Sequence, residues 1–437
     1  MRVAILGGGL AGLSAALHIP APHTATVFEQ EEKPGGLATS DVQGGATFDH
    51  GVHVLHTKDE ELLAFFEEMV GFMPTQRQKA RIFSHDIYTK FPFQANTYGL
   101  PIDVVKDCLL EFIKVTYEGK QTGSFANYRE WMYAVYGRGI CEHFMVPYSR
   151  KMWTVEPEEL NTEWMAPRFA RPSLEEVIEG ALHEQPKEFG ANARFRYPEH
   201  GGAERISASL ARCVKDVRLR HRVVALDTDR RIATFANGLV ERFDVAIATI
   251  PLPVLVRALR PLPPLAIREA AAQLRWLSIF TINWLVDREQ VTEDHWAYFL
   301  DERFPFFRLS FPGNIGRGNI PAGKTAIQCE ISHTIQKPID RSSVVQASTD
   351  SLWETGLLRA GDRVEVVGVR DLPFAYVLFT HGRRDFVEMI HRYLLSHGIY
   401  PAGRFGEWGY LWMHDAVVSG RQAALQAVRV GTVSALS

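Results

Sequence analysis

The 437-residue sequence predicts an α/β protein whose Rossmann-like nucleotide-binding domain carries an inserted helical domain and an antiparallel β-sheet substrate domain. Three observations predict this fold class. An apolar strand enters a glycine-rich turn within residues 2–18, apolar positions recur at helical spacing within 98–185, and residues 270–370 alternate as strands do. A chain of this length exceeds one hydrophobic core, so two or three domains are expected.

The composition is that of a soluble globular protein. Apolar residues make up 46% and charged residues 23%, and the net charge is -3, so we expect no nucleic-acid partner. No apolar run approaches the roughly 20 residues of a membrane span. The four cysteines lack the spacing of a zinc site or a disulfide framework and are expected as buried thiols. These features predict a cytoplasmic protein with no metal and no membrane span, and they leave a homodimer open.

The first strand and turn predict dinucleotide binding. Val3–Leu6 has the pattern of a buried parallel strand, and Gly7, Gly9 and Gly12 follow it before a helix. Glycines allow a tight turn and the close approach of a pyrophosphate, and the helix N-terminus offers amides to it. A second strand ends at Glu29, about 20 residues on, where a βαβ unit places the acid that binds a ribose hydroxyl.

A second glycine turn favours FAD as the dinucleotide. Lys33–Leu37 follows Glu29 and resembles the loop at the adenosine–pyrophosphate half of FAD in a large flavoprotein family. That family contains amine oxidases, protoporphyrinogen oxidases and UDP-galactopyranose mutases. Asp244–Pro251 and the turn at Gly398–Gly403 are similar to its later FAD-binding segments, and His414 and Asp415 open the last helix.

The stretches between these segments have other patterns. Val104–Ile113 places apolar residues at helical spacing, whereas Ser278–Val286 alternates as a strand does. We therefore expect a discontinuous FAD-binding domain at residues 1–97, 191–262 and 371–437, a helical domain at 98–190, and an antiparallel sheet substrate domain at 263–370.

Four further segments narrow the resemblance to UDP-galactopyranose mutases. Phe48–Thr57 is similar to the bacterial G-x-H-I-F-H-T segment, and Pro147–Leu160 to Y-T-x-K-x-W-G-x-x-P-x-x-L. Arg196–Gly202 and Gly403–Tyr410 resemble the fungal F-R-x-P-x-x-G-G and G-R-F-G-S-W-R-Y segments. The matches follow the family's order along most of the chain, which makes them specific together.

This resemblance implies an FAD-dependent isomerase of carbohydrate biosynthesis. It would interconvert the pyranose and furanose forms of a nucleotide-diphosphate sugar, such as UDP-galactose, by attack of reduced-flavin N5 on the anomeric carbon without net redox change. NAD(P)H is then the expected electron source. A flavin oxidoreductase of the amine oxidase or protoporphyrinogen oxidase type is the alternative, and a non-catalytic nucleotide-binding relative is the third interpretation.

The same resemblance assigns the site residues. In this resemblance Arg308 and Arg404 correspond to the arginines that bind the diphosphate. Arginine suits that role because its guanidinium fork makes charge-assisted hydrogen bonds to phosphate. Both lie in apolar, aromatic sequence where an unpaired arginine is costly, so a bound anion is expected beside each. Catalytic roles are assigned to His53, Arg168, Arg308 and Arg404, and substrate contacts to Phe91, Gln94, Trp153, Arg168, Asn192, Tyr298, Arg308, Tyr376, Arg404 and Tyr410. FAD contacts are assigned to Gly7, Gly9, Leu10, Ala11, Gly12, Glu29, Gly35, Gly36, Leu37, His53, Val224, Gly403, Asp415 and Ala416.

Three departures from the family pattern leave the sugar and the nucleotide open. Phe91 replaces the tyrosine expected at the uridine, Gly409 replaces a basic residue, and Leu411–Asp415 differs from the bacterial Tyr-Tyr-Asp-Met-Asp. Other arginines, among them Arg303, Arg383 and Arg384, are expected on the solvated surface.

Overall fold

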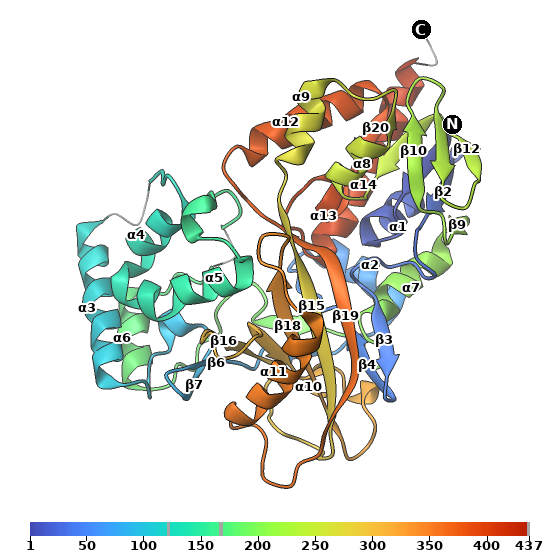
Figure 1. Ribbon diagram of the computed structural model, residues 1–437. Helices are drawn as coiled ribbons and strands as arrows, with labels where there is room; N and C mark the ends of the chain where they lie inside the picture. The colour runs from blue at the N-terminus through green and yellow to red at the C-terminus, as the bar shows by residue number, and fades with distance from the viewer. Residues whose placement is uncertain (120–122, 166–168, 435–437) are drawn as a thin grey trace.

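The computed structural model describes residues 1–119, 123–165 and 169–434 (Figure 1). Arg168, assigned to the substrate site from the sequence, lies outside these residues.

A parallel five-stranded sheet carries the first glycine turn. Its strand order is β20-β13-β1-β2-β9, and each neighbouring pair is parallel. Helices covering a parallel sheet require apolar strands, and most of β1 and all of β13 are buried. The strands are β1 (Arg2–Leu6), β2 (Thr24–Phe28), β9 (Val217–Arg218), β13 (Val245–Ala248) and β20 (Ile399–Pro401), and the helices are α1 (Leu10–Leu17), α2 (Glu60–Val70), α7 (Glu204–Cys213), α13 (Gly403–Gly406) and α14 (Met413–Ser434).

A four-stranded sheet of order β12-β11-β10-β14 adjoins the first sheet. Phe28 of β2 stacks on Phe235 with ring centroids 4.5 Å apart, which joins the two sheets. The strands of this sheet are β10 (Val223–Asp227), β11 (Ile232–Phe235), β12 (Val240–Arg242) and β14 (Leu259–Arg260). The other helices of this part of the chain are α8 (Leu252–Ala258), α9 (Leu265–Ala272) and α12 (Arg383–Ser396).

The helices of residues 102–182 form a separate group in Figure 1. Two glycines allow α3 and α4 to pack closely: a Cβ on Gly137 would lie 2.5 Å from the Glu111 carbonyl oxygen, and one on Gly139 2.4 Å from that of Asp107. Gly137 also has φ +74, which other residues adopt at a cost. The elements are α3 (Ile102–Glu118), α4 (Tyr128–Ile140), a π-helical turn (Cys141–Met145), α5 (Val146–Trp153), a 3-10 turn (Pro157–Glu159) and α6 (Leu174–Leu182).

A seven-stranded sheet of order β19-β15-β18-β17-β16-β6-β7 forms the third part. It is antiparallel except for the parallel pair β16–β6, and it recruits β6 and β7 from residues 80–90. The hairpin of β3 (Ser40–Gln43) and β4 (Ala46–Asp49) packs through Phe48 against Leu285 of β15. The preceding residue, Trp284, donates from its ring N–H to Thr349 Oγ1 of α11 at 3.0 Å. The elements are β6 (Ala80–Ser84), β7 (Ile87–Lys90), β15 (Trp276–Val286), β16 (Trp296–Phe299), β17 (Arg308–Ser310), β18 (Thr325–His333), β19 (Val364–Val377), α10 (Pro312–Ile315), the 3-10 turn Arg317–Asn319 and α11 (Arg341–Glu354).

Smaller elements link these parts. The hairpin consists of β3 (Ser40–Gln43) and β4 (Ala46–Asp49), β5 (Thr75–Arg77) pairs with β8 (Arg194–Arg196), and Phe93–Ala95 forms a 3-10 turn.

The cysteine expectation is wrong at one position. Cys108, Cys141 and Cys329 are buried thiols, but Cys213 is exposed because it ends α7 at the surface. Within the described ranges no group of His, Cys, Asp and Glu side chains could hold a metal ion. Among the helices that the structure describes, none has the length and apolar character to cross a bilayer.

Candidate active site

The first glycine turn joins β1 to α1 and requires glycine for two reasons. Gly7 has φ +108, and a Cβ on Gly12 would lie 2.0 Å from the Gly7 carbonyl oxygen. Glu29, at the end of β2, accepts hydrogen bonds from the Gly8 amide at 2.6 Å and the Glu31 amide at 2.9 Å. Burial raises the pKa of this carboxyl. The turn and its acid therefore lie together, as in a βαβ dinucleotide site.

Two other glycine turns meet the first one. The Gly35 amide donates to Gly8 O at 2.8 Å, and the Cβ position of Gly403 lies 2.6 Å from the Cβ of Ala11. A Cβ on Gly9 would find no atom nearer than 3.9 Å, at Gly35 and Gly36. The missing side chain thus leaves open space between two backbone turns at the start of α1. This space and the helix N-terminus fit the pyrophosphate of FAD.

The remaining residues assigned to FAD lie around these turns, with one exception. Leu10 and Ala11 begin α1 and are buried, Leu37 follows the second turn, and Asp415 and Ala416 lie in the first turn of α14. The exception is Val224, an exposed residue that lies on β10 outside the glycine turns.

A cavity of about 260 Å³ adjoins these turns. Its wall combines residues of the helical group, of the seven-stranded sheet and of the C-terminal segment. Among the residues assigned from the sequence, those in the wall are Leu37, His53, Phe91, Gln94, Trp153, Asn192, Tyr298, Arg308, Tyr376, Arg404 and Tyr410.

Arg308 has a carboxylate partner inside the protein. It lies opposite Glu330 in the β17–β18 ladder, and its Nε and Nη2 donate to the Glu330 carboxylate at 2.6–2.9 Å. Glu330 is 2% exposed. Arg308 therefore does not depend on a bound anion for its charge balance, because the sheet register supplies a carboxylate.

Arg404 is held by neutral groups instead. It donates to Leu411 O at 2.6 and 3.1 Å and to Ala375 O at 2.9 Å. Its guanidinium lies 5.4 Å from the ring centre of Tyr376 and 5.6 Å from that of Tyr410. Within the described part of the chain no carboxylate forms an ion pair with Arg404, so its charge can bind an external anion.

Tyrosine hydroxyls surround the two arginines. Tyr376 and Tyr410 stack at 5.6 Å and 18°, and Tyr298 faces Arg308 across the β16–β17 ladder. Burial raises the pKa of Tyr298, Tyr376 and Tyr148, which keeps these hydroxyls protonated as donors. The cavity thus presents several protonated donors together with one guanidinium that lacks a carboxylate partner.

A row of stacked rings forms another wall. Phe144 stacks on Phe93 at 5.0 Å and on Tyr148 at 5.5 Å, with interplanar angles of 7° and 8°. Phe91, where the family resemblance expects tyrosine, packs on Tyr298 at 5.3 Å. Phe144 and Tyr148 of this stack line the cavity, whereas Phe93 is fully buried and does not line it.

The sequence assignments did not include Phe144, Tyr148 or Glu330. The signal for the two aromatics was their i, i+4 spacing, which puts them on one helix face. Gln328, Glu330 and Ser332 recur at every second residue of a buried strand, and this polar period of two was the available signal for Glu330.

His53 is a neutral imidazole in the cavity wall. Burial, and after it the charge of the nearby Arg404, lower the pKa of His53 to about 3. Its Nδ1 lies 3.1 Å from Gly51 O, which can only accept, so Nδ1 carries the proton. Nε2 is therefore an unprotonated acceptor at neutral pH.

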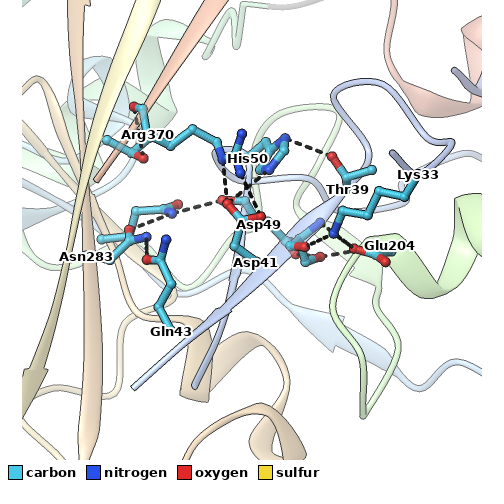
Figure 2. Close-up of polar contacts among 12 residues, drawn as sticks. Lys33, Thr39, Asp41, Gln43, Asp49, His50, Glu204, Asn283 and Arg370 are labelled. Atoms are coloured by element: carbon cyan, nitrogen blue, oxygen red, sulfur yellow. Dashed lines mark hydrogen bonds and ion pairs between the residues drawn. The ribbon is translucent and has the colours of Figure 1, made fainter. Parts of the chain in front are cut away.

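The β3–β4 hairpin connects the second glycine turn to the seven-stranded sheet (Figure 2). His50 lies 2.8 Å from Thr39 Oγ1 through Nδ1 and 3.3 Å from Asp41 through Nε2. Thr39 donates to Gly36 O at 2.7 Å, and Arg370 of β19 donates to the two carboxylate oxygens of Asp41 at 2.5 and 2.9 Å. Burial alone raises the pKa of Asp41, but the hydrogen bonds from His50 and Arg370 outweigh it and hold that pKa well below its usual range.

Comparison with known proteins places this geometry in context. The family model of flavin containing amine oxidoreductases matches residues 10–428. A crystal structure of reduced UDP-galactopyranose mutase is 25% identical and superposes with a TM-score of 0.92 over 98% of this chain and 96% of that one. A putative protoporphyrinogen oxidase from Exiguobacterium sp. 255-15 is 18% identical, with a TM-score of 0.76 over 97% and 98% of the two chains. A putrescine oxidase bound to putrescine is 15% identical, with a TM-score of 0.64 over 98% and 99%. The last two likenesses concern the fold alone.

Proposed function

The chain belongs to the flavin containing amine oxidoreductases and its cofactor is FAD; on this premise we propose that it is a nucleotide-sugar mutase. It would interconvert the pyranose and furanose forms of a nucleoside-diphosphate sugar of the UDP-galactose type. The observation that carries the proposal is the set of protonated tyrosines around Arg308 and Arg404 in one cavity beside the glycine turns. A diphosphate is the anion that such donors suit.

The likeness to a UDP-galactopyranose mutase supports the same substrate class. It extends over 98% of this chain, so it includes the helical group and the seven-stranded sheet as well as the glycine turns. The aromatic residues of the cavity wall, among them Phe91 and Tyr148, support a nucleotide base as the group beside the diphosphate.

Each group has a role in this proposal. When bound at the glycine turns, reduced FAD would supply the electron pair, at N5, that the anomeric carbon requires, and NAD(P)H is the proposed electron source. Arg404 holds the diphosphate while it leaves and returns, and Tyr376 and Tyr410 donate to it. His53 Nε2 accepts a hydrogen bond from a hydroxyl group of the sugar, and the aromatic side chains of the wall exclude water.

A flavin oxidoreductase acting on an amine or a cyclic substrate is the second candidate. The Arg308–Glu330 pair favours it, because the pair neutralises one of the two cations that a diphosphate needs.

One experiment separates the two candidates. The purified protein is reduced with dithionite under nitrogen and incubated with UDP-galactopyranose and other nucleotide sugars, and the ring form of the product is measured by chromatography and NMR. The mutase proposal expects furanose product with the reduced enzyme only. Oxygen consumption by the oxidised enzyme with an amine, together with no conversion of any nucleotide sugar, would contradict it.

A further inference from the structure

Arg383 is buried, contrary to the expectation from the sequence, although its neighbour Arg384 is exposed. The two side chains are 10% and 71% exposed. Arg383 begins α12 directly after Gly382, whose φ of +75 turns the chain inward at this point. The burial of a charged residue at a helix start requires partners inside the protein.

The partners of Arg383 come from three segments. Its guanidinium lies 4.2 Å from the ring centre of Phe379, and Nη1 lies 3.5 Å from the Glu163 carboxylate. Nη2 donates to Trp408 O. Burial lowers the pKa of Arg383 to about 10, so the group stays charged at neutral pH.

Trp408 holds a backbone conformation that tryptophan rarely adopts. Its φ is +52, its side chain is fully buried, and the following Gly409 amide donates to Arg404 O at 2.9 Å. This turn sets the direction of the chain between Arg404 and Tyr410. The hydrogen bond from Arg383 fixes the carbonyl at the centre of the turn.

The other side of Arg383 reaches the helical group. Glu163 precedes Trp164, whose ring packs against Trp153 at 4.8 Å and Tyr410 at 6.3 Å in the cavity wall. Next to Arg383, the Asn161 amide donates to Phe379 O at 2.7 Å. Arg383 therefore connects the segment at Glu163, whose neighbour Trp164 packs on Tyr410, with the turn at Trp408, which precedes Tyr410 in the chain.

We propose that Arg383 is a positioning residue, which holds the turn at Trp408 so that Arg404 and Tyr410 face the substrate diphosphate. Arg383 is not part of the cavity wall, so it acts through the turn. The inference rests on the proposed function for the identity of the ligand.

The test compares Arg383→Met and Arg383→Lys with the matched control Arg384→Met in the FAD-loaded enzyme. The readouts are the Kd for UDP by calorimetry, kcat and KM for the nucleotide sugar, and the flavin absorption spectrum. We expect Arg383→Met to raise the UDP Kd and KM about tenfold with a smaller change in kcat, because misplaced binding groups lose affinity. Arg383→Lys keeps a donor to Trp408 O and should give an intermediate Kd, and Arg384→Met should match the wild type.

An unchanged UDP Kd in Arg383→Met would overturn the proposal. If that variant does not retain FAD, Arg383→Lys decides: weaker UDP binding with a normal flavin spectrum supports the proposal, and wild-type binding overturns it.

A wild-type protein that binds no UDP contradicts the proposed function, and amide hydrogen exchange of residues 404–411 then tests the positioning role. Faster exchange in Arg383→Met than in Arg384→Met supports that role, and equal exchange refutes it.

Discussion

Arg308 and Arg404 line the same cavity, but their charges are balanced in different ways. Arg308 has Glu330 at 2.6 Å, whereas Arg404 has backbone carbonyls and aromatic rings. Removing a guanidinium from a buried carboxylate leaves an uncompensated buried charge, whereas a guanidinium held by neutral groups keeps its charge for a ligand. The two residues should therefore differ in what their removal affects.

Replacing Arg308 by methionine should destabilise the protein more than replacing Arg404 does. Arg308→Met leaves the Glu330 carboxylate buried and unpaired, which costs about 3–5 kcal/mol of the free energy of unfolding. The double variant Arg308→Met, Glu330→Gln should recover most of that loss, since no buried charge remains. Urea denaturation of the three variants measures this, and equal stability of Arg308→Met and Arg404→Met would contradict it.

His53, which is partly buried in the cavity wall, should make the protein less stable in acid. Its pKa is lowered to about 3 in the folded state, by burial and then by Arg404, from 6.5 when unfolded. Between these two values the unfolded chain binds a proton that the folded one does not, so stability falls as the pH drops from 6.5 toward 3. The loss is about 1.4 kcal/mol per unit of pKa difference at most. Denaturation midpoints of His53→Gln should depend less steeply on pH across this window, and parallel curves for the variant and wild type would disprove the assignment.

Asp49 changes the pH dependence of stability in the opposite direction to His53. Burial raises the pKa of Asp49 to about 6, although Ala203 N, Ser40 Oγ and Tyr197 Oη donate to it. The folded state then holds a proton above the usual range of an aspartate, so stability decreases as the pH rises from 3.8 to about 6. The comparison of His53→Gln with wild type isolates the histidine because both proteins keep Asp49.

Among the elements, the β3–β4 hairpin couples the glycine turns to the seven-stranded sheet. Besides the Asp41–Arg370 pair, Asn283 of β15 donates to Gln43 at 2.7 Å and Gln328 of β18 donates to Asp49 O at 2.9 Å. The hairpin therefore bonds to three strands of that sheet while His50 faces the cavity. A movement of the sheet would be transmitted to the second glycine turn through the hydrogen bond from Thr39 to Gly36 O.

The α3–α4 contact depends on glycine, which gives a prediction with an internal control. Gly137→Ala must adopt φ +74 and also place its Cβ 2.5 Å from Glu111 O. Gly119→Ala has a similar φ of +66 with no atom within 4 Å, so only the backbone strain applies. We expect about 1 kcal/mol for Gly119→Ala and about 2 kcal/mol more for Gly137→Ala, because overpacking adds to strain. Thermal unfolding followed by circular dichroism measures both, and equal losses would show that the helices can move apart.

At the scale of the whole molecule, local motifs and long-range partners differed in how well they could be predicted. The turn at Gly7 and its acid Glu29 follow from a motif in which backbone geometry dictates the residue type, so the fold class and the FAD-binding turns were accessible from the sequence. The resemblance named residues from Phe91 to Tyr410 that the structure brings into one cavity wall.

Side-chain partners that depend on strand register or on burial could not be predicted from the sequence. Glu330 meets Arg308 only because β17 and β18 pair in one register, and Arg383 is buried only because Trp408 and Glu163 converge on it. β6 joins the sheet by pairing in parallel with β16, and β7 then pairs with β6, an arrangement that no local pattern encodes. In each case the sequence shows the residue type, and tertiary packing decides its neighbour.

Because the cavity wall draws on all three parts of the chain, a ligand there should stabilise the protein as one unit. Under the proposed function, UDP at a concentration of 100 times its Kd adds about 2.7 kcal/mol to the free energy of unfolding. Flavin fluorescence should then report a higher melting temperature with UDP, and uridine should give little shift because it lacks the diphosphate. Arg404→Met should lose most of the UDP shift and melt close to the wild type without ligand, since no carboxylate is left unpaired. Equal shifts for UDP and uridine, or an undiminished shift in Arg404→Met, would show that the base rather than the diphosphate is bound and that Arg404 does not hold the anion.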